Sequence, residues 1–148
     1  GVITPKPNLI NVVPGEVKMT VDLRNIDDER LKKAEKILHE EIENICRQEK
    51  VIAETEKLVR FEPVQFNMRI CSLIADVTEN EGISYSRLNS GAGHDAQMMA
   101  RICPTAMIFV PSKAGISHNP KEYTAKEFLD VGADILFKTM KRIDHDDI

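Results

Sequence analysis

The sequence lacks several features that mark specialised classes of protein. It has no Trp, only 5% aromatic residues, and three cysteines without CxxC spacing. Three widely separated cysteines indicate neither a disulfide framework nor a zinc knuckle. Two of the cysteines, Cys46 and Cys71, lie in helical patterns among apolar residues. They are typical of reduced core cysteines, and we therefore expect a cytoplasmic protein.

Long apolar runs and basic clusters are also missing. No run approaches the length of a membrane span, and the first residues lack the charged start and apolar block of a signal peptide. The net charge is −4 without a basic patch, so we expect neither nucleic acid nor a membrane surface as a partner. What is present is a globular balance of 42% hydrophobic and 30% charged residues over 148 positions.

The first sixty residues predict a small antiparallel α+β lobe. The expected elements are a strand at residues 10–13, a strand at 16–24, a helix from the N-cap Asp27 to about Arg47, and a strand at 51–61. In the second strand, apolar and polar side chains alternate, which indicates one buried face. The helix has an apolar stripe that would cover this face.

The composition changes at Glu62-Pro63, the best candidate for a domain boundary. The expected elements after it are a helix at residues 67–79 stopped by Gly82, a strand at 83–88, a helix at 95–103, a strand at 105–110, a last helix opened by a capping box of Thr124 and Glu127, and a frayed polar tail at 144–148. This alternation indicates an α/β sheet, but two strands do not build a core alone. This shortage of strands, together with the missing initial Met, favours a C-terminal fragment over a processed or tagged chain.

Two Gly-containing loops each present a histidine. His118 follows the apolar strand and precedes Asn119-Pro120. An imidazole there could be a metal ligand, a general base or a donor to an anion. His94 follows Gly91 and Gly93 at a helix start, which suits contact with an anion or oxyanion, although a surface histidine at a capped helix is the simpler interpretation.

Two further polar residues are candidates for substrate contact. Arg24 closes the polar face of its strand and could bind a carboxylate through its planar fork, or merely solvate the sheet. Asn11 could be a recognition amide or a strand-end residue. The sequence has no HxD or HExxH metal motif and no phosphate loop.

These residues fall in four motifs that match a known family. In order, they are Pro7-Asn8-Leu9-Ile10-Asn11-Val12-Val13-Pro14-Gly15, Val21-Asp22-Leu23-Arg24, Ser90-Gly91-Ala92-Gly93-His94-Asp95-Ala96, and Pro111-Ser112 through Gly115-Ile116-Ser117-His118-Asn119-Pro120 with Glu122. The chain resembles N-carbamoyl-L-amino-acid hydrolases, allantoate amidohydrolases and ureidopropionases. These form the amidase branch of the dinuclear zinc aminoacylase and carboxypeptidase superfamily. The resemblance covers essentially the whole chain.

The resemblance implies a fold and a domain organisation. Such enzymes have an α/β catalytic domain and an inserted lid domain that makes a homodimer. By resemblance, residues 1–62 are the later part of the lid and dimerisation domain, an antiparallel sheet with a helix. Residues 63–148 would be the C-terminal strands and helices of an incomplete α/β zinc-hydrolase catalytic domain.

The resemblance also implies the site and its chemistry. It makes His118 a metal ligand, Asn11 and Arg24 substrate-binding residues, and His94 a catalytic residue that contacts the substrate. The cofactors would be two divalent ions, zinc or manganese. The substrate would be a carbamoyl amino acid, allantoate or a similar ureido acid, whose C–N bond is cleaved by metal-bound hydroxide.

The family's other metal ligands, its paired-Glu general base and its early lid histidine have no counterpart in this chain. One histidine does not hold two zinc ions, so we expect the chain alone to be inactive and to bind zinc weakly. Two alternatives are a stand-alone dimerisation or interaction module, and a related aminoacylase or metallopeptidase that cleaves an amide.

Overall fold

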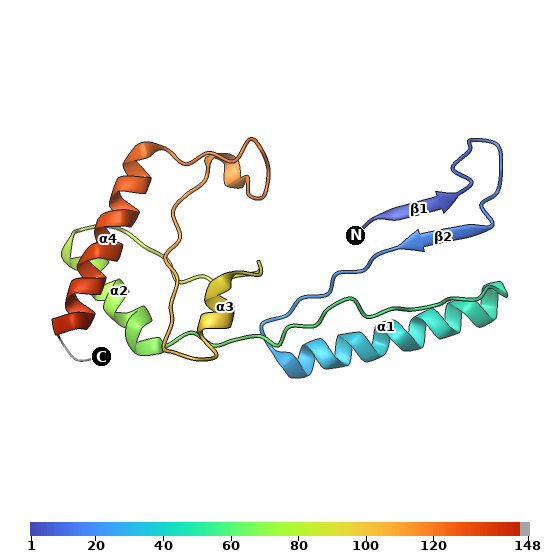
Figure 1. Cartoon of the computed structure of the whole chain (residues 1–148), viewed down its shortest axis with the longest axis horizontal. Coiled ribbons are helices and arrows are strands. Elements are labelled where there is room, and N and C mark those ends of the chain that lie inside the picture. Colours follow the sequence, from blue (N-terminus) through green and yellow to red (C-terminus); the bar gives the residue numbers. More distant parts are fainter. Residues whose placement is uncertain (146–148) are drawn as a thin grey trace. The chain divides into compact units, whose positions relative to one another are not determined.

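The computed structural model describes residues 1–145, which divide into two compact units, one of Gly1–Pro63 and one from Val64 onward (Figure 1). The elements are β1 Ile3–Lys6, β2 Glu16–Met19, α1 Asp28–Glu49, α2 Met68–Asn80, α3 Asp95–Met99, the 3-10 turn η1 Lys113–Gly115 and α4 Lys126–His145. Within the described range, no helix has both the length and the apolar character needed to cross a membrane.

The sheet of the first unit is a hairpin of β1 and β2. The strands are antiparallel, with Ile3 opposite Met19 and Lys6 opposite Glu16. The strand predicted at residues 10–13 is wrong. The Gly15 N–H donates to the Lys6 carbonyl at 3.0 Å and closes the ladder there, so residues 10–13 lie in the connecting loop. The second predicted strand is shorter than expected: β2 ends at Met19, which lies opposite Ile3, the first residue of β1.

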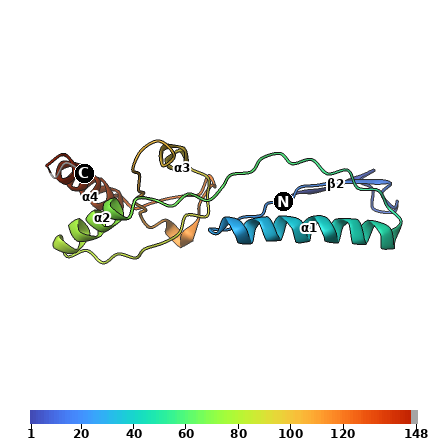
Figure 2. The ribbon, with the colours of Figure 1, turned by 90° about the horizontal axis from the view of Figure 1, so that it is seen from below.

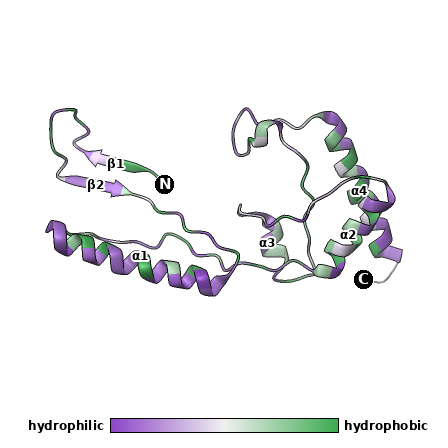
Figure 3. Ribbon diagram, turned by 180° about the vertical axis from the view of Figure 1, so that it is seen from behind, coloured by the Kyte–Doolittle hydropathy of each residue, from purple (hydrophilic) through white to green (hydrophobic). Residues whose placement is uncertain are grey.

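The long helix α1 confirms the prediction for this segment. The Asp27 carboxylate caps it by accepting from the backbone N–H groups of Glu29 and Arg30, at 2.9 and 3.2 Å. The helix is mostly hydrophilic, with apolar residues at intervals along it (Figure 3). It ends at Lys50, which takes a left-handed conformation with φ 55°.

The third strand predicted at residues 51–61 is wrong. This segment is extended but belongs to no sheet; it runs back along α1 (Figures 1 and 2). Side chains tie it there, because Arg60 donates to Asp28 at 2.5 Å and to Glu35 at 2.8 Å. The backbone therefore lies against a helix, where no ladder of hydrogen bonds can form.

The core of the second unit is the packing of α2 against α4. The Asn67 side chain caps α2 by accepting from the N–H groups of Arg69 and Ile70. At its other end Gly82 has φ 68°, and the Gly82 and Ile83 N–H groups donate to the carbonyls of the last turn. Helix α4 begins at Lys126, one residue later than the predicted capping box of Thr124 and Glu127 requires, so that start is wrong by one residue. The buried residues here are Leu73, Ala75, Val77, Thr78, Ile135 and Thr139.

The two strands predicted in the second unit are wrong, and so is the α/β sheet that they implied within the described residues. Residues 83–88 and 105–110 form no ladder. A strand needs a partner, and residues 105–110 lie instead against α4, where Val110 approaches Gly132. The predicted helix at 95–103 is shortened to α3. Part of the tail predicted to fray, residues 146–148, lies outside the described range.

Candidate functional site

His118 is held in a loop with unusual backbone geometry. Three of its residues have left-handed φ angles: Ala114 at 56°, Gly115 at 66° and His118 at 54°. The loop is closed at its base, where the Lys113 N–H donates to the Tyr123 carbonyl at 2.8 Å. Residues other than Gly take this conformation at a cost, and they concentrate at functional sites. The geometry therefore singles out this loop.

A turn after His118 brings a carboxylate back to it. The Glu122 N–H donates to the Asn119 carbonyl at 2.8 Å, and the Asn119 side chain accepts from the Lys121 N–H at 2.9 Å. Asn followed by Pro120 is typical of such turns. The Glu122 Oε2 atom accepts the His118 backbone N–H at 2.8 Å. The His118 side chain itself is exposed.

His94 is the N-cap of α3. Its Nδ1 atom accepts the backbone N–H of Ala96 at 2.9 Å. In a neutral ring, the other nitrogen must then carry the proton. This cap fixes the tautomer and leaves the Nε2–H of an exposed ring as a hydrogen-bond donor.

Arg24 lies beyond β2 and makes a two-point contact with Asp22. Its Nε atom donates to Oδ1 at 2.9 Å and its Nη2 atom to Oδ2 at 2.6 Å. This hydrogen bonding, with the opposite charges, raises the pKa of Arg24 and lowers the pKa of Asp22. The guanidinium thus already binds a carboxylate through its fork, in an exposed position. Asn11 is exposed in the β1–β2 loop.

The four predicted residues fall into two pairs. Asn11 and Arg24 belong to the first unit, and His94 and His118 to the second. Across residues 1–145, no three His, Cys, Asp or Glu side chains gather as metal ligands. His118 is a donor of the right type, but a zinc site takes three or four protein ligands. The described residues therefore supply only part of a metal centre.

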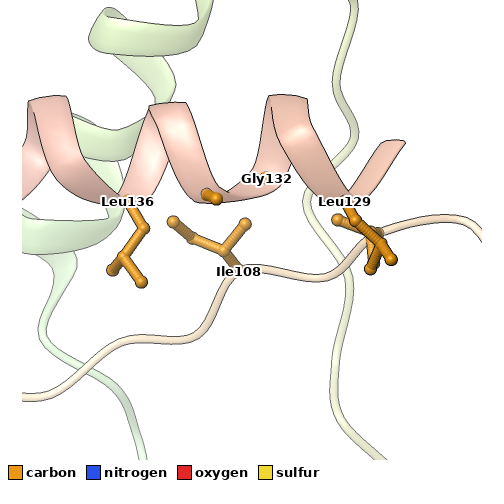
Figure 4. Close-up of a pocket in the computed structure, with 6 residues that line it drawn as sticks. Ile108, Leu129, Gly132 and Leu136 are labelled. Carbon is orange, nitrogen blue, oxygen red and sulfur yellow. The ribbon is translucent and has the colours of Figure 1, made fainter. Parts of the chain in front are cut away.

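An apolar pocket lies on α4, and none of the four candidate residues lines it. It has a volume of about 230 Å³ and is lined by Ile108, Val110, Leu129, Gly132, Ala133 and Leu136. Figure 4 shows Ile108 below Gly132, between Leu129 and Leu136. A binding site for a polar substrate needs convergent polar groups, which this lining does not supply.

The four motifs contain Asp22 and Glu122, but the sequence alone predicted no role for either residue. The structure shows each one bonded to a candidate residue, Asp22 to Arg24 and Glu122 to His118. A signal existed for Glu122, because an Asn-Pro turn after His118 returns the chain to it. The spacing of Asp22 and Arg24, two residues apart on the same face of the strand predicted at residues 16–24, was a signal as well.

Comparison with known proteins identifies relatives along nearly the whole chain. The model of peptidase family M20/M25/M40 matches residues 3–142. An allantoate amidohydrolase of Bacillus subtilis is 38% identical over 142 residues, covering 93% of this chain and 34% of the relative. An N-carbamoyl-L-amino-acid amidohydrolase of Rhizobium meliloti is also 38% identical, covering 88% and 32%.

A solved structure agrees with these relatives. An amidase of the hydantoinase/carbamoylase family from Burkholderia vietnamiensis superposes with a TM-score of 0.85 at 34% identity, over 95% of this chain and 34% of that one. The chain thus spans about a third of the length of the relatives that it matches. The resemblance inferred from the four motifs is confirmed. The chain belongs to peptidase family M20/M25/M40.

Proposed function

We propose that the chain is part of a metal-dependent amidohydrolase that cleaves the ureido C–N bond of a carbamoyl amino acid, allantoate or a similar ureido acid. The observation that carries this proposal is the match of both units to relatives named for such substrates. A relative from Arabidopsis thaliana named ureidoglycolate hydrolase, 30% identical, supports the same substrate class.

In this proposal the first unit binds the substrate's carboxylate. The fork of Arg24, which holds Asp22 at two points, suits a carboxylate of the substrate equally well. Asn11 would contribute an amide that both donates and accepts. We place the first unit in the lid and dimerisation domain. Its homodimer would form through the sheet, where Val17 and Met19 are exposed.

The second unit, in this proposal, is the C-terminal part of the catalytic domain. His94 would donate its Nε2–H to the oxygen of the ureido carbonyl as negative charge develops there. His118 would be one ligand of a pair of divalent ions, zinc or manganese, which supply a Lewis acid. The other ligands and the general base would come from the part of the relatives that this chain does not span. We place the enzyme in the cytoplasm, in keeping with its free cysteines.

A substrate panel on the longer protein tests the reaction. We expect ammonia release from carbamoyl amino acids or allantoate to exceed amino acid release from N-acyl substrates. The reverse preference would instead support an aminoacylase or peptidase, as the family name allows. The 148-residue chain alone should show no hydrolysis, and measurable turnover by it would contradict the incomplete metal centre.

The substitution Arg24→Lys tests the carboxylate contact. Lys keeps the charge but loses the two-point fork, so KM should rise about tenfold or more, the loss expected of one charged hydrogen bond. The matched control is Arg30→Lys, whose parent residue is an exposed arginine of the same unit that pairs with Asp27 at 3.6 Å. An unchanged KM in Arg24→Lys would remove Arg24 from the substrate site.

A further inference from the structure

We propose that Glu122 is a positioning residue for His118: its carboxylate holds the His118 backbone in the left-handed region and so sets the direction in which the imidazole leaves the loop. The consequence for a metal ion rests on the proposed function. The consequence for the loop does not, and it can be tested in this chain.

The first step is the cost of the His118 conformation. A φ of 54° is unfavourable for a residue with a side chain, and nearby Ala114 takes the same kind of angle at 56°. Such residues persist only where neighbouring contacts hold them. The contact made by His118 itself is the hydrogen bond from its backbone N–H to Glu122, at 2.8 Å.

The second step is the strength of that contact. An N–H that donates to a carboxylate forms a charge-assisted bond, which is stronger than a bond between neutral groups. This bond uses the backbone N–H of His118 and neither nitrogen of its imidazole ring. Glu122 can therefore fix the residue without occupying the ring.

The third step is that the carboxylate is itself fixed. The turn at Asn119 returns the chain, and its two hydrogen bonds, to the N–H groups of Lys121 and Glu122, set the position of Glu122. The next residue, Tyr123, accepts the Lys113 N–H and closes the loop. Glu122 thus lies between two anchored points, and its side chain reaches one target, the His118 N–H.

Amide hydrogen exchange in the 148-residue chain tests the loop directly. In Glu122→Ala the His118 amide should exchange about tenfold faster or more, because it loses its acceptor. Lys121→Ala is the matched control, since Lys121 enters the turn through its backbone N–H, and it should leave the His118 amide unchanged. Unchanged exchange in Glu122→Ala would overturn the proposal.

A second variant guards against general unfolding. Glu122→Gln keeps an acceptor oxygen but loses the charge, so protection of the His118 amide should fall between that of the parent chain and that of the Ala variant. A Gln variant that exchanges as fast as the Ala variant, with the far-ultraviolet circular dichroism of the parent, would mean that this oxygen does not hold the amide. That result would also overturn the proposal.

Metal binding by the longer protein separates this inference from the proposed function. Glu122→Ala should weaken Co²⁺ affinity about 10- to 100-fold and alter the visible spectrum of the bound ion, as expected when a ligand loses its support. If His118→Ala leaves Co²⁺ affinity unchanged, the assignment of His118 as a ligand fails, and the exchange result still decides the role of Glu122. If His118→Ala weakens binding and Glu122→Ala does not, the positioning role alone fails.

Discussion

Each of the two units is stabilised internally by a different kind of interaction. Among the described residues, Leu31 is the one buried apolar side chain of the first unit, whereas Leu73, Ala75, Val77 and Ile135 are buried in the second. The first unit relies on a short hairpin and on ion pairs to Arg60, whose side chain is only 19% exposed. The second unit relies on apolar packing of α2 against α4. Acid should therefore weaken the first unit, and a cavity should weaken the second.

The difference also bears on the site. In each unit, a candidate residue is bonded to a carboxylate close in sequence: Arg24 to Asp22, and His118 to Glu122. Such local pairs do not depend on a large core. The candidate side chains can be held in position even in a unit that buries little apolar surface.

The largest effect should come from a cavity in the second unit. Ile135 is 3% exposed on α4, and Ile135→Ala should lower the free energy of unfolding by about 2–5 kcal/mol. The matched control is Leu136→Ala, because Leu136 is 52% exposed and loses less on truncation. Urea unfolding, with hydrogen exchange to locate the change, measures both. Equal losses would contradict a core centred on α2 and α4.

A smaller effect should follow from filling the space at Gly132. A Cβ atom there would lie 2.5 Å from Cγ1 of Val110. Overpacking of this kind costs about 1–3 kcal/mol, against a gain of about 1 kcal/mol in helix propensity. We expect Gly132→Ala to destabilise the chain on balance. Val110→Ala in the same chain should remove the clash, and a double variant no better than the sum of the two singles would contradict it.

The helices could be predicted from the sequence and most of the strands could not. The signals of α1 and α2 are local: the caps Asp27 and Asn67 and an apolar stripe within each helix. A strand depends on a partner that local pattern does not identify. The loosely alternating segment at residues 51–61 and the apolar segment at residues 105–110 have strand-like sequences, but both lie against helices.

The candidate site divides in the same way. The motifs identified His94, His118, Arg24 and Asn11 as residues, but the use of each polar atom came from the structure. The sequence does not show that Nδ1 of His94 accepts a hydrogen bond from the Ala96 N–H. That bond leaves Nε2 of the neutral ring as the donor. These contacts depend on rotamers and turn geometry, which spacing alone does not fix.

A matched pair of cap substitutions should have similar effects in the two units. Asn67→Ala and Asp27→Ala each remove two hydrogen bonds to the first turn of a helix. Each should cost about 1 kcal/mol. Thermal unfolding followed by circular dichroism measures the loss, with Lys121→Ala as a control outside any helix. A much larger loss in one unit would show that its helix depends on the cap more than on packing.

The smallest effect, and the one that best separates the units, should be a response to acid confined to the first unit. Hydrogen bonds from Lys32 and Arg60 hold the pKa of Asp28 below its ordinary value of 3.8. Partial burial acts to raise the pKa of Glu35, but the hydrogen bond and charge of Arg60 keep it below 4.5. The folded state therefore binds fewer protons than the unfolded chain. The stabilisation is complete above these ordinary values and is lost as pH falls through the lowered ones.

Removal of Arg60 should reduce this response without abolishing it, because Lys32 still pairs with Asp28 at 2.9 Å and Lys57 with Glu35 at 3.4 Å. In Arg60→Met, Asp28 and Glu35 lose their common partner. Protection from exchange in residues 28–35 and 51–61, relative to the intrinsic rate at each pH, should therefore be lower at pH 6 and should change less between pH 6 and pH 3. The effect should be modest, because ion pairs near the surface contribute little in water, and high salt should reduce it in the parent chain. Exchange in α2 and α4 serves as the internal control. If acid opens those helices as early as the first unit, the two units do not differ in what holds them.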